Sequence, residues 1–351
     1  MIYNVYLDGI NIYDGANDMI LLDPSLKMEL NAAGSLEFTM PVYHKCYDLP
    51  KLLTSDVEVY ENNELIWYGR VVEINISMNK NKTVYCEGPF AFFNDSVQRP
   101  AVYDTTTVKE FFKSVISNHN GSVPTNRQFT VGEVTVADVN IYRELNYDKT
   151  IDVINRMCLN AEGGYLFFYR DKGLNYVDWL SDVPYESTQP VQFGLNLVDL
   201  SQHFNGSNIK TAVLPLGKET DGEKLTIKDI NDGLDYLDSD AVSTYGRITE
   251  VVEFSEIIYT DMLLSAARKW LSDKQFDPFS IECSAAELHY ISDSYTPFRI
   301  GQNVRVTSEP HLIDKLLPLT KISIKLDSGV KQISVGTPER RDLSEIYKPS
   351  E

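Results

Sequence analysis

A pattern of alternating apolar and polar residues in the first hundred positions most limits what this chain can fold into. From residue 72 to residue 77 the side chains alternate, which is the two-residue period of a half-buried β-strand. A polar turn at 79–82 and a second alternating run at 84–87 follow. Gly88-Pro89 ends that run, and an aromatic cluster occupies 90–93. The segment therefore predicts a β-hairpin that is followed by a large apolar anchor.

A similar pattern recurs about 250 residues later. The corresponding segments share alternation, a polar turn and a glycine after the last strand; they are Val57–Val59 with Val304–Val306, Val72–Ile76 with Ile322–Leu326, and Val84–Cys86 with Ile333–Val335. A nearly constant offset is what an internal duplication produces. Unrelated β-strands share such alternation too, which is the competing explanation. We predict from the duplication that one chain contains two similar small β-barrels.

The fold class predicted for the whole chain is α+β and mainly β. It comprises two tube-type barrel domains, an inserted α+β domain and a further small α/β segment, because helical apolar stripes interrupt the series of short strands. The expected division is 1–98 for the first barrel, 99–190 for the inserted domain, 191–250 for a return segment that completes the first half, 251–338 for a helix plus the second barrel, and 339–351 for a flexible tail.

The charge balance limits the possible functions. The chain has 51 acidic and 32 basic residues, which gives a formal charge of −19. This charge argues against a protein that binds the phosphate backbone of a nucleic acid. A surface past which DNA slides without sticking remains compatible with this charge. The start of the sequence has no signal-peptide pattern, and no apolar run reaches the length of a membrane span. We therefore expect a protein that is made in a cytoplasm and is soluble there.

No residue pattern predicts a cofactor or a metal. The four cysteines are too widely spaced for a zinc site or a disulfide framework and are expected to be buried thiols. The acidic segment 229–240 lacks the glycine position and the closing glutamate of a calcium loop, so a solvated loop is the favoured interpretation. We expect no catalytic, cofactor-binding or metal-binding residue.

Two less favoured functions, catalysis and carbohydrate binding, can each be assigned candidate residues. His44 lies two positions before Cys46, which would suit a Cys–His nucleophile, and His311 is a further candidate for such chemistry. Exposed Trp67, Trp179 or tyrosines could instead form a carbohydrate-binding face, although packing in a core or an interface is the favoured role for tryptophan.

The sequence also resembles a known family. The matching segments, each short and together spanning nearly the whole chain, are Leu36–Pro41, Gly69–Val71, Tyr85–Gly88, Phe93–Ser96, Gly163–Leu166, Leu214–Gly217, Asn231–Gly233, Gly301–Val304, Ser308–Asp314 and Ile322–Ile324. They are similar to the tail hub proteins of siphophages and prophages of Gram-positive bacteria, a family also described as prophage tail endopeptidases or tail-associated lysins.

The resemblance implies a hub like that of contractile-phage baseplates and secretion-system spikes. Such hubs are homotrimers in which each subunit contributes two β-barrels to a ring, so that a threefold tip joins a sixfold tube. The implied partners are further copies of the chain, the distal tail protein, the tape-measure protein and tip or receptor-binding proteins, with DNA passing through unbound. Longer members continue into a lytic or receptor-binding region, for which we expect no room here.

The expected function is therefore a structural, non-enzymatic component of the virion tail. The outward residues of the two matched strands become candidates for the lumen or the neighbouring subunit; they are Glu73, Asn75, Ser77, Ser323 and Lys325. The alternatives are a peptidoglycan endopeptidase of the tail tip and a carbohydrate-binding tip module.

Overall fold

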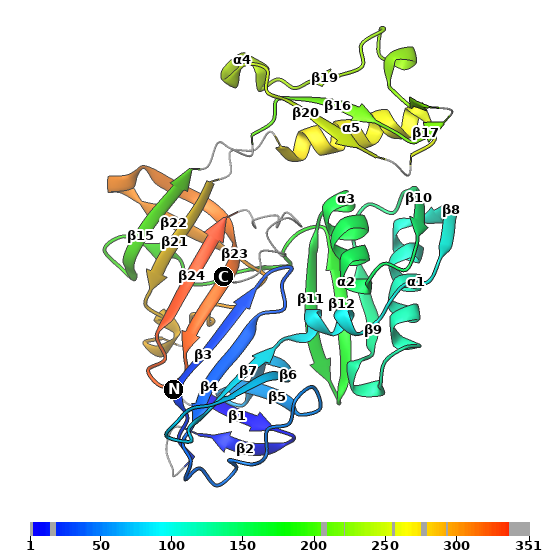
Figure 1. Ribbon diagram of the computed structural model, residues 1–351. Coiled ribbons are helices and arrows are strands. Elements are labelled where there is room, and N and C mark those ends of the chain that lie inside the picture. The colour runs from blue at the N-terminus through cyan, green and yellow to red at the C-terminus, as the bar shows by residue number, and fades with distance from the viewer. Residues whose placement is uncertain are drawn as a thin grey trace.

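The computed structural model describes residues 3–14, 19–204, 209–220, 222–254, 257–274, 279–292 and 294–336. The tail that was expected to be flexible, 339–351, lies outside the described residues. The chain is α+β and mainly β, as the sequence predicts, and its strands and helices form four groups that we name as units (Figure 1).

The N-terminal sheet unit holds the hairpin that dominates the sequence pattern. Its strands are β1 (Tyr3–Leu7), β2 (Ile10–Tyr13), β3 (Leu22–Glu29), β4 (Ser35–Met40), β5 (Asp56–Glu61), β6 (Glu64–Ile76) and β7 (Lys82–Glu87). All neighbours pair antiparallel in the order β3-β4-β7-β6-β5-β1-β2. The predicted hairpin is β6 with β7.

The C-terminal sheet unit is assembled from two distant parts of the chain. Its elements are β13 (Tyr185–Glu186), β14 (Val191–Gln192), β15 (Leu197–Phe204), β21 (Phe279–Ala285), η6 (Leu288–Tyr290), β22 (Gln302–Ser308), η7 (Glu309–His311), β23 (Ile313–Lys325) and β24 (Lys331–Gly336). The order β15-β21-β24-β23-β22 repeats the order β3-β4-β7-β6-β5 strand for strand. The two units therefore share one topology as well as one sequence pattern.

The register of the repeat differs by two residues from the sequence alignment. Ile74 pairs with Val84, and the residue in the equivalent position, Ile322, pairs with Ile333. The alignment of the two repeats by sequence had instead made Ile322 the equivalent of Val72. Both long strands carry a bulge at the equivalent place, between Val71 and Glu73 and between Leu319 and Lys321. A shift of two keeps every side chain on its own face, so periodicity could not detect it.

Pairing of β23 with β3 joins the two units into one 14-stranded sheet (Figure 1). Two closed barrels, as expected from the sequence, are not found among the described strands. The reason is that the first strand of one repeat is hydrogen-bonded to the other repeat, and the path stays open from β15 to β2. One hydrophobic core covers both units and includes Leu26, Leu36, Val84, Ile322 and Ile333, each at most 2% exposed.

The inserted unit packs on the aromatic segment that follows β7. Its elements are η1 (Pro89–Asp95), β8 (Ala101–Thr107), α1 (Val108–Asn120), η2 (Thr125–Arg127), β9 (Phe129–Val134), β10 (Asn140–Leu145), α2 (Thr150–Val153), a π-helical turn (Ile154–Leu159), α3 (Asn160–Glu162), β11 (Tyr165–Asp171) and β12 (Leu174–Leu180). Phe90, Phe92 and Phe93 are buried in its core, where Phe93 lies 4.8 Å from Phe129 between ring centroids. The predicted anchor thus joins this unit to the sheet.

A small α/β unit completes the chain (Figure 1, top). Its elements are β16 (Ala212–Leu216), β17 (Glu219–Thr220), β18 (Glu223–Lys224), η5 (Lys228–Ile230), β19 (Leu237–Asp238), α4 (Val242–Tyr245), β20 (Thr249–Glu253) and α5 (Thr260–Lys274). Helix α5 packs on β16, with Val213, Ala267 and Leu271 in a small shared core. An ion pair of 2.7 Å between Lys269 Nζ and Glu162 Oε2 connects this helix to the inserted unit.

Candidate assembly surface

One face of the 14-stranded sheet is polar across the junction of the two sheet units. Cross-strand register leads from Lys325 to Ser25, from Ser25 to Glu37, from Glu37 to Tyr85 and from Tyr85 to Glu73. Directly opposed residues of neighbouring strands lie on the same face of a sheet. We name this surface the polar sheet face.

Four of the five sequence-predicted residues lie on the polar sheet face. Ser323 is two positions before Lys325 on β23, and Asn75 is two positions after Glu73 on β6. Ser77 follows the end of β6 and belongs to the hairpin turn, where its hydroxyl donates to the carbonyl oxygen of Asn81 at 3.0 Å. The structure therefore brings matched outward residues of the two repeats onto one continuous surface.

The alternation along β6 is less regular than the sequence suggests. Because of the bulge, Val71 is fully buried while Val72 is half-buried. Ile76 was expected to point inward with Val72 and Ile74, but its side chain is 62% exposed. Met78, in the turn beyond the strand, is also fully exposed. The end of this hairpin extends past the hydrophobic core, which explains why an apolar residue there stays in solvent.

The charges on the polar sheet face are mixed. Its register rows from β23 to β6 carry four acidic and four basic side chains, namely Glu29, Glu37, Glu73, Glu87, Lys27, Arg70, Lys321 and Lys325. Lys321 and Glu29 approach to 3.6 Å. The chain's charge of −19 is therefore not concentrated on this face. The face is not strongly basic either, which keeps it compatible with weak contact to DNA.

A buried ion-pair cluster connects the two sheet units on their inner side. Lys331 Nζ on β24 lies 2.9 Å from Glu61 Oε1 on β5 and 2.6 Å from Glu287 Oε1. Arg299 forms a further ion pair with Glu61, and the Tyr3 hydroxyl donates to Glu61 Oε1 at 2.8 Å. The side chains of Lys331 and Glu61 are each only 1% exposed. Two cations therefore neutralise two carboxylates across the junction.

The electrostatic environment keeps Glu61 ionised. Burial alone would raise the pKa of its carboxyl, but the charges of Lys331 and Arg299, with hydrogen bonds from Lys331 and Tyr3, lower that pKa to about 2. Sequence reasoning missed this cluster because its members are far apart along the chain. The one local signal was the polar Lys331 at the start of an otherwise alternating strand.

A second group of arginines fixes the inserted unit to the sheet. Arg70 of β6 donates to Glu87 at 2.8 Å and pairs with Asp95, while its guanidinium lies 5.2 Å from the centroid of the Phe92 ring. Arg127 of the inserted unit lies 4.6 Å from the same ring centroid. Two guanidinium groups thus contact the aromatic anchor, so charge as well as apolar packing holds the inserted unit on the sheet.

The structure places His44 and Cys46 close together but does not form a nucleophile pair. His44 Nδ1 accepts a hydrogen bond from the backbone N–H of Cys46 at 3.1 Å, and Nε2 bonds to the carbonyl of Ile12 at 3.0 Å. Burial lowers the pKa of His44, and the Ile12 carbonyl opposes that effect. Both ring nitrogens are thus used by the backbone, and neither is available to accept a proton from the Cys46 thiol.

The other histidine and tryptophan candidates are also structural. His311 is exposed, and its Nδ1 bonds at 2.7 Å to the hydroxyl of Ser308, which is itself buried. Trp179 is fully buried in the inserted unit and donates to the carbonyl of Gly163 at 2.9 Å. Trp67 is 7% exposed. Neither tryptophan presents the open ring face that stacking on a sugar requires.

The cysteines, the possible metal ligands and the helices of the described residues provide no further candidate site. Cys86, Cys158 and Cys283 are buried, Cys46 is half-buried, and all four are free thiols. Within the described ranges no group of histidine, cysteine, aspartate and glutamate side chains is arranged to hold a metal ion. Among those same residues, no helix combines the length and the apolar character needed to span a bilayer.

The fold of the chain is similar to those of several solved tail proteins. The fold is similar over 97% of this chain and 99% of the other to the 43 kDa tail protein of prophage MuSo2 from Shewanella oneidensis, at 14% identity and a TM-score of 0.67. Prophage tail protein gp18 from Listeria monocytogenes matches 99% of this chain and 97% of its own, at 13% identity and a TM-score of 0.61. A type VI secretion component of E. coli, described as structurally similar to the T4 tail proteins gp27 and gp5, matches 94% of this chain and 76% of its own, at 10% identity and a TM-score of 0.52. The chain therefore shares the fold of these prophage tail proteins.

The sequence match is narrower and more specific. Residues 185–335 match the family model described as Prophage endopeptidase tail, a segment that begins at β13 and ends in β24. A search of curated proteins finds no significant match. Together with the fold, this segment confirms the resemblance to prophage tail hub proteins that the sequence motifs predict.

Proposed function

We propose that the chain is a structural component of a phage or prophage tail, the hub at the distal end of the tube. The observation that supports this most directly is the repeated strand order β3-β4-β7-β6-β5 and β15-β21-β24-β23-β22 within one continuous sheet. Three copies of such a chain present six equivalent units, which is the symmetry needed to join a threefold tip to a sixfold tube. In this proposal each unit corresponds to one tube-type barrel of the ring.

The polar sheet face has a defined place in this proposal. Glu73, Asn75, Ser77, Ser323 and Lys325 line the lumen or contact the neighbouring subunit. Mixed charge without a basic excess suits a passage through which DNA moves without being held. The further partners are the distal tail protein above the ring, the tape-measure protein inside it and tip or receptor-binding proteins below. The site of action is the virion tail, during attachment and DNA ejection.

A catalytic role receives no support from the candidate residues. The matching family model carries the word endopeptidase in its description, but both nitrogens of His44 bond to the backbone and Ser308 beside His311 is buried. We therefore propose a non-enzymatic hub, with peptidoglycan cleavage as the alternative to be tested. The division into a first barrel domain, an inserted domain and a second barrel domain stays part of this proposal, whereas β15, within the expected return segment 191–250, pairs with β21 of the second repeat and does not complete the first half.

The test combines assembly with activity. Light scattering and native mass spectrometry of the purified chain over a range of concentrations are expected to show a trimer, and incubation with cell walls is expected to release no peptidoglycan fragments. A monomer that digests cell walls would refute the hub. The lumen assignment is tested in assembled tails, where Glu73→Arg is expected to slow DNA ejection while Glu133→Arg, on the inserted unit, leaves it unchanged.

A further inference from the structure

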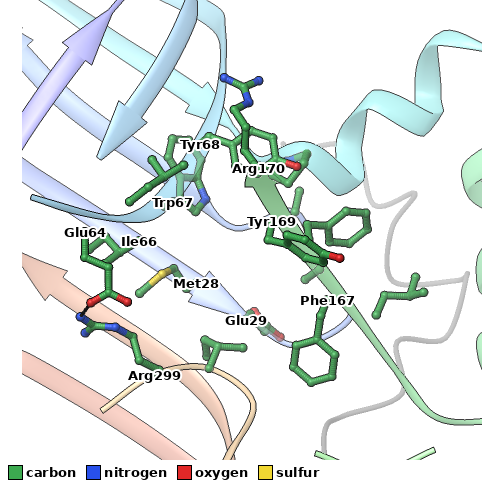
Figure 2. Close-up of a pocket in the computed structure, with 17 residues that line it drawn as sticks. Met28, Glu29, Glu64, Ile66, Trp67, Tyr68, Phe167, Tyr169, Arg170 and Arg299 are labelled. Carbon is green, nitrogen blue, oxygen red and sulfur yellow. Dashed lines mark hydrogen bonds and ion pairs between the residues drawn. The ribbon is translucent and has the colours of Figure 1, made fainter. Parts of the chain in front are cut away.

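A cavity of about 250 Å³ lies where the N-terminal sheet unit, the inserted unit and the loop before β22 meet. Figure 2 shows Trp67 and Ile66 on one side, residues of β11 on the other, and Met28 of β3 between them. The lining is largely apolar and aromatic. A cavity of this kind between rigid units is a typical place for a ligand.

Two strand edges border the cavity. Five consecutive residues of β6 (64–68) and five consecutive residues of β11 (166–170) line it. Because side chains of successive strand residues point to opposite faces, a strand that lines a cavity with every residue presents its edge to it. The cavity is therefore bordered by backbone hydrogen-bonding groups as well as by side chains.

Neither edge is paired in this region. The ladder between β6 and β7 ends at Arg70 opposite Glu87, so 64–68 of β6 pair with β5 alone. Strand β11 is the outer strand of the order β11-β12-β9. The β11–β12 hairpin closes at Asp171 and Leu174, which directs the backbone groups of Phe168 and Arg170 away from β12. Among the described residues these groups have no backbone partner.

The charges that border the cavity are neutralised within the chain. Arg170 donates to Glu58 at 2.8 Å, and Arg299 pairs with Glu61 and, at 3.0 Å, with Glu64. A ligand therefore finds apolar side chains, unpaired backbone groups and no net charge to compensate. These three properties fit an uncharged extended peptide, because a guest strand supplies backbone donors and acceptors on both of its edges.

We infer that this cavity binds an extended, uncharged segment of another polypeptide by β-strand addition along β11, with an apolar side chain inserted beside Trp67. The guest strand would lie where β7 no longer pairs with β6, and it would connect the 14-stranded sheet to the sheet of the inserted unit. The site is independent of the ring proposed above, since it needs no second copy of the chain.

The experiment uses capped, uncharged pentapeptides with Thr at odd positions and Val, Leu, Phe or Tyr at even positions. Binding to the full chain is measured by calorimetry, and amide hydrogen exchange is followed by NMR. At least one peptide is expected to bind and to slow exchange at Phe168 and Arg170 about tenfold, while Val177 of the central strand β12, already paired on both sides, is unchanged. N-methylation of every second amide is expected to weaken that binding about tenfold, since a methylated amide donates no hydrogen bond.

A variant pair tests the cavity itself. Ala32→Phe places a ring in the cavity and is expected to abolish peptide binding, while Ala137→Phe, on an exposed position of the inserted unit, leaves it unchanged. Circular dichroism confirms that both variants are folded. The inference is overturned if no peptide binds, if N-methylated peptides bind equally well, or if Ala32→Phe instead prevents self-association of the chain. Trimer formation without peptide binding would overturn this inference and leave the hub proposal intact.

Discussion

The buried carboxylate of Glu61 gives a quantitative prediction about how the two sheet units hold together. Its pKa is about 2 in the folded chain against a usual value of 4.5. At about 1.36 kcal/mol per pKa unit, the ionised carboxylate contributes about 3 kcal/mol to folding. Because the folded pKa is the lower one, this contribution is complete above pH 4.5 and is lost as pH falls from there toward 2.

The perturbation is Glu61→Gln, which removes the charge and leaves Lys331 and Arg299 with one buried carboxylate fewer. At pH 7 the variant is expected to lose about 3 kcal/mol of unfolding free energy, in line with the cost of breaking a buried ion pair. Between pH 4.5 and pH 2 the wild type is expected to lose stability faster than the variant, so that the two curves converge.

The assay is urea unfolding at several pH values, with amide exchange at Ile333 of β24 as a local measure of the junction. Glu37→Gln, on the polar sheet face, serves as the matched control and is expected to follow the wild-type pH dependence. Parallel curves for wild type and Glu61→Gln across this pH range would show that the carboxylate does not carry the stability assigned to it.

Three further substitutions test local features. Thr107 caps α1 in a capping box with Glu110, so Thr107→Ala is expected to cost about 1 kcal/mol in thermal unfolding, and an unchanged melting temperature would contradict the cap. A Cβ at Gly88 would lie 1.9 Å from the carbonyl oxygen of Ala33, so Gly88→Ala is expected to lower stability strongly in urea unfolding. Gly121→Ala, whose Cβ would have its nearest contact at 3.6 Å, is expected to be tolerated, and equal effects of the two variants would refute the steric argument. Leu312 is 95% exposed with a left-handed φ of 54°, so Leu312→Gly is expected to gain about 1 kcal/mol, and a loss would reveal packing in the assembled state.

Much of the local structure follows from short-range sequence pattern. The hairpin of β6 and β7, its aromatic anchor and the buried stripe of α1 were all predicted, because periodicity reports which side of an element meets a core. The cap of α1 is Thr107, the last of three consecutive threonines at 105–107. A few adjacent threonines are equivalent in sequence, and only the position of Glu110 distinguishes them.

The repeat shows where pattern stops being sufficient. Alternation identified the matched strands but could not fix their alignment to better than two residues. A shift of two residues leaves each side chain on the same face of the sheet. The register of the two repeats is fixed by the bulges beside Val71 and Leu319. The sequence alternation did not reveal where these bulges lie. The pairing of β23 with β3, which joins the two sheet units into one continuous sheet, is likewise a contact between distant segments.

The sequence by itself predicted the resemblance to prophage tail proteins, the mainly β composition and the alternating pattern of the main strands. Those properties depend on neighbours along the chain and on short motifs. The tertiary structure decided the rest: that Glu73 and Lys325 share one face, that Glu61 and Lys331 neutralise each other in the core, and that β6 and β11 border one cavity with unpaired edges. Each of these depends on the distance between segments far apart in the chain, which hydrogen-bond register and packing set.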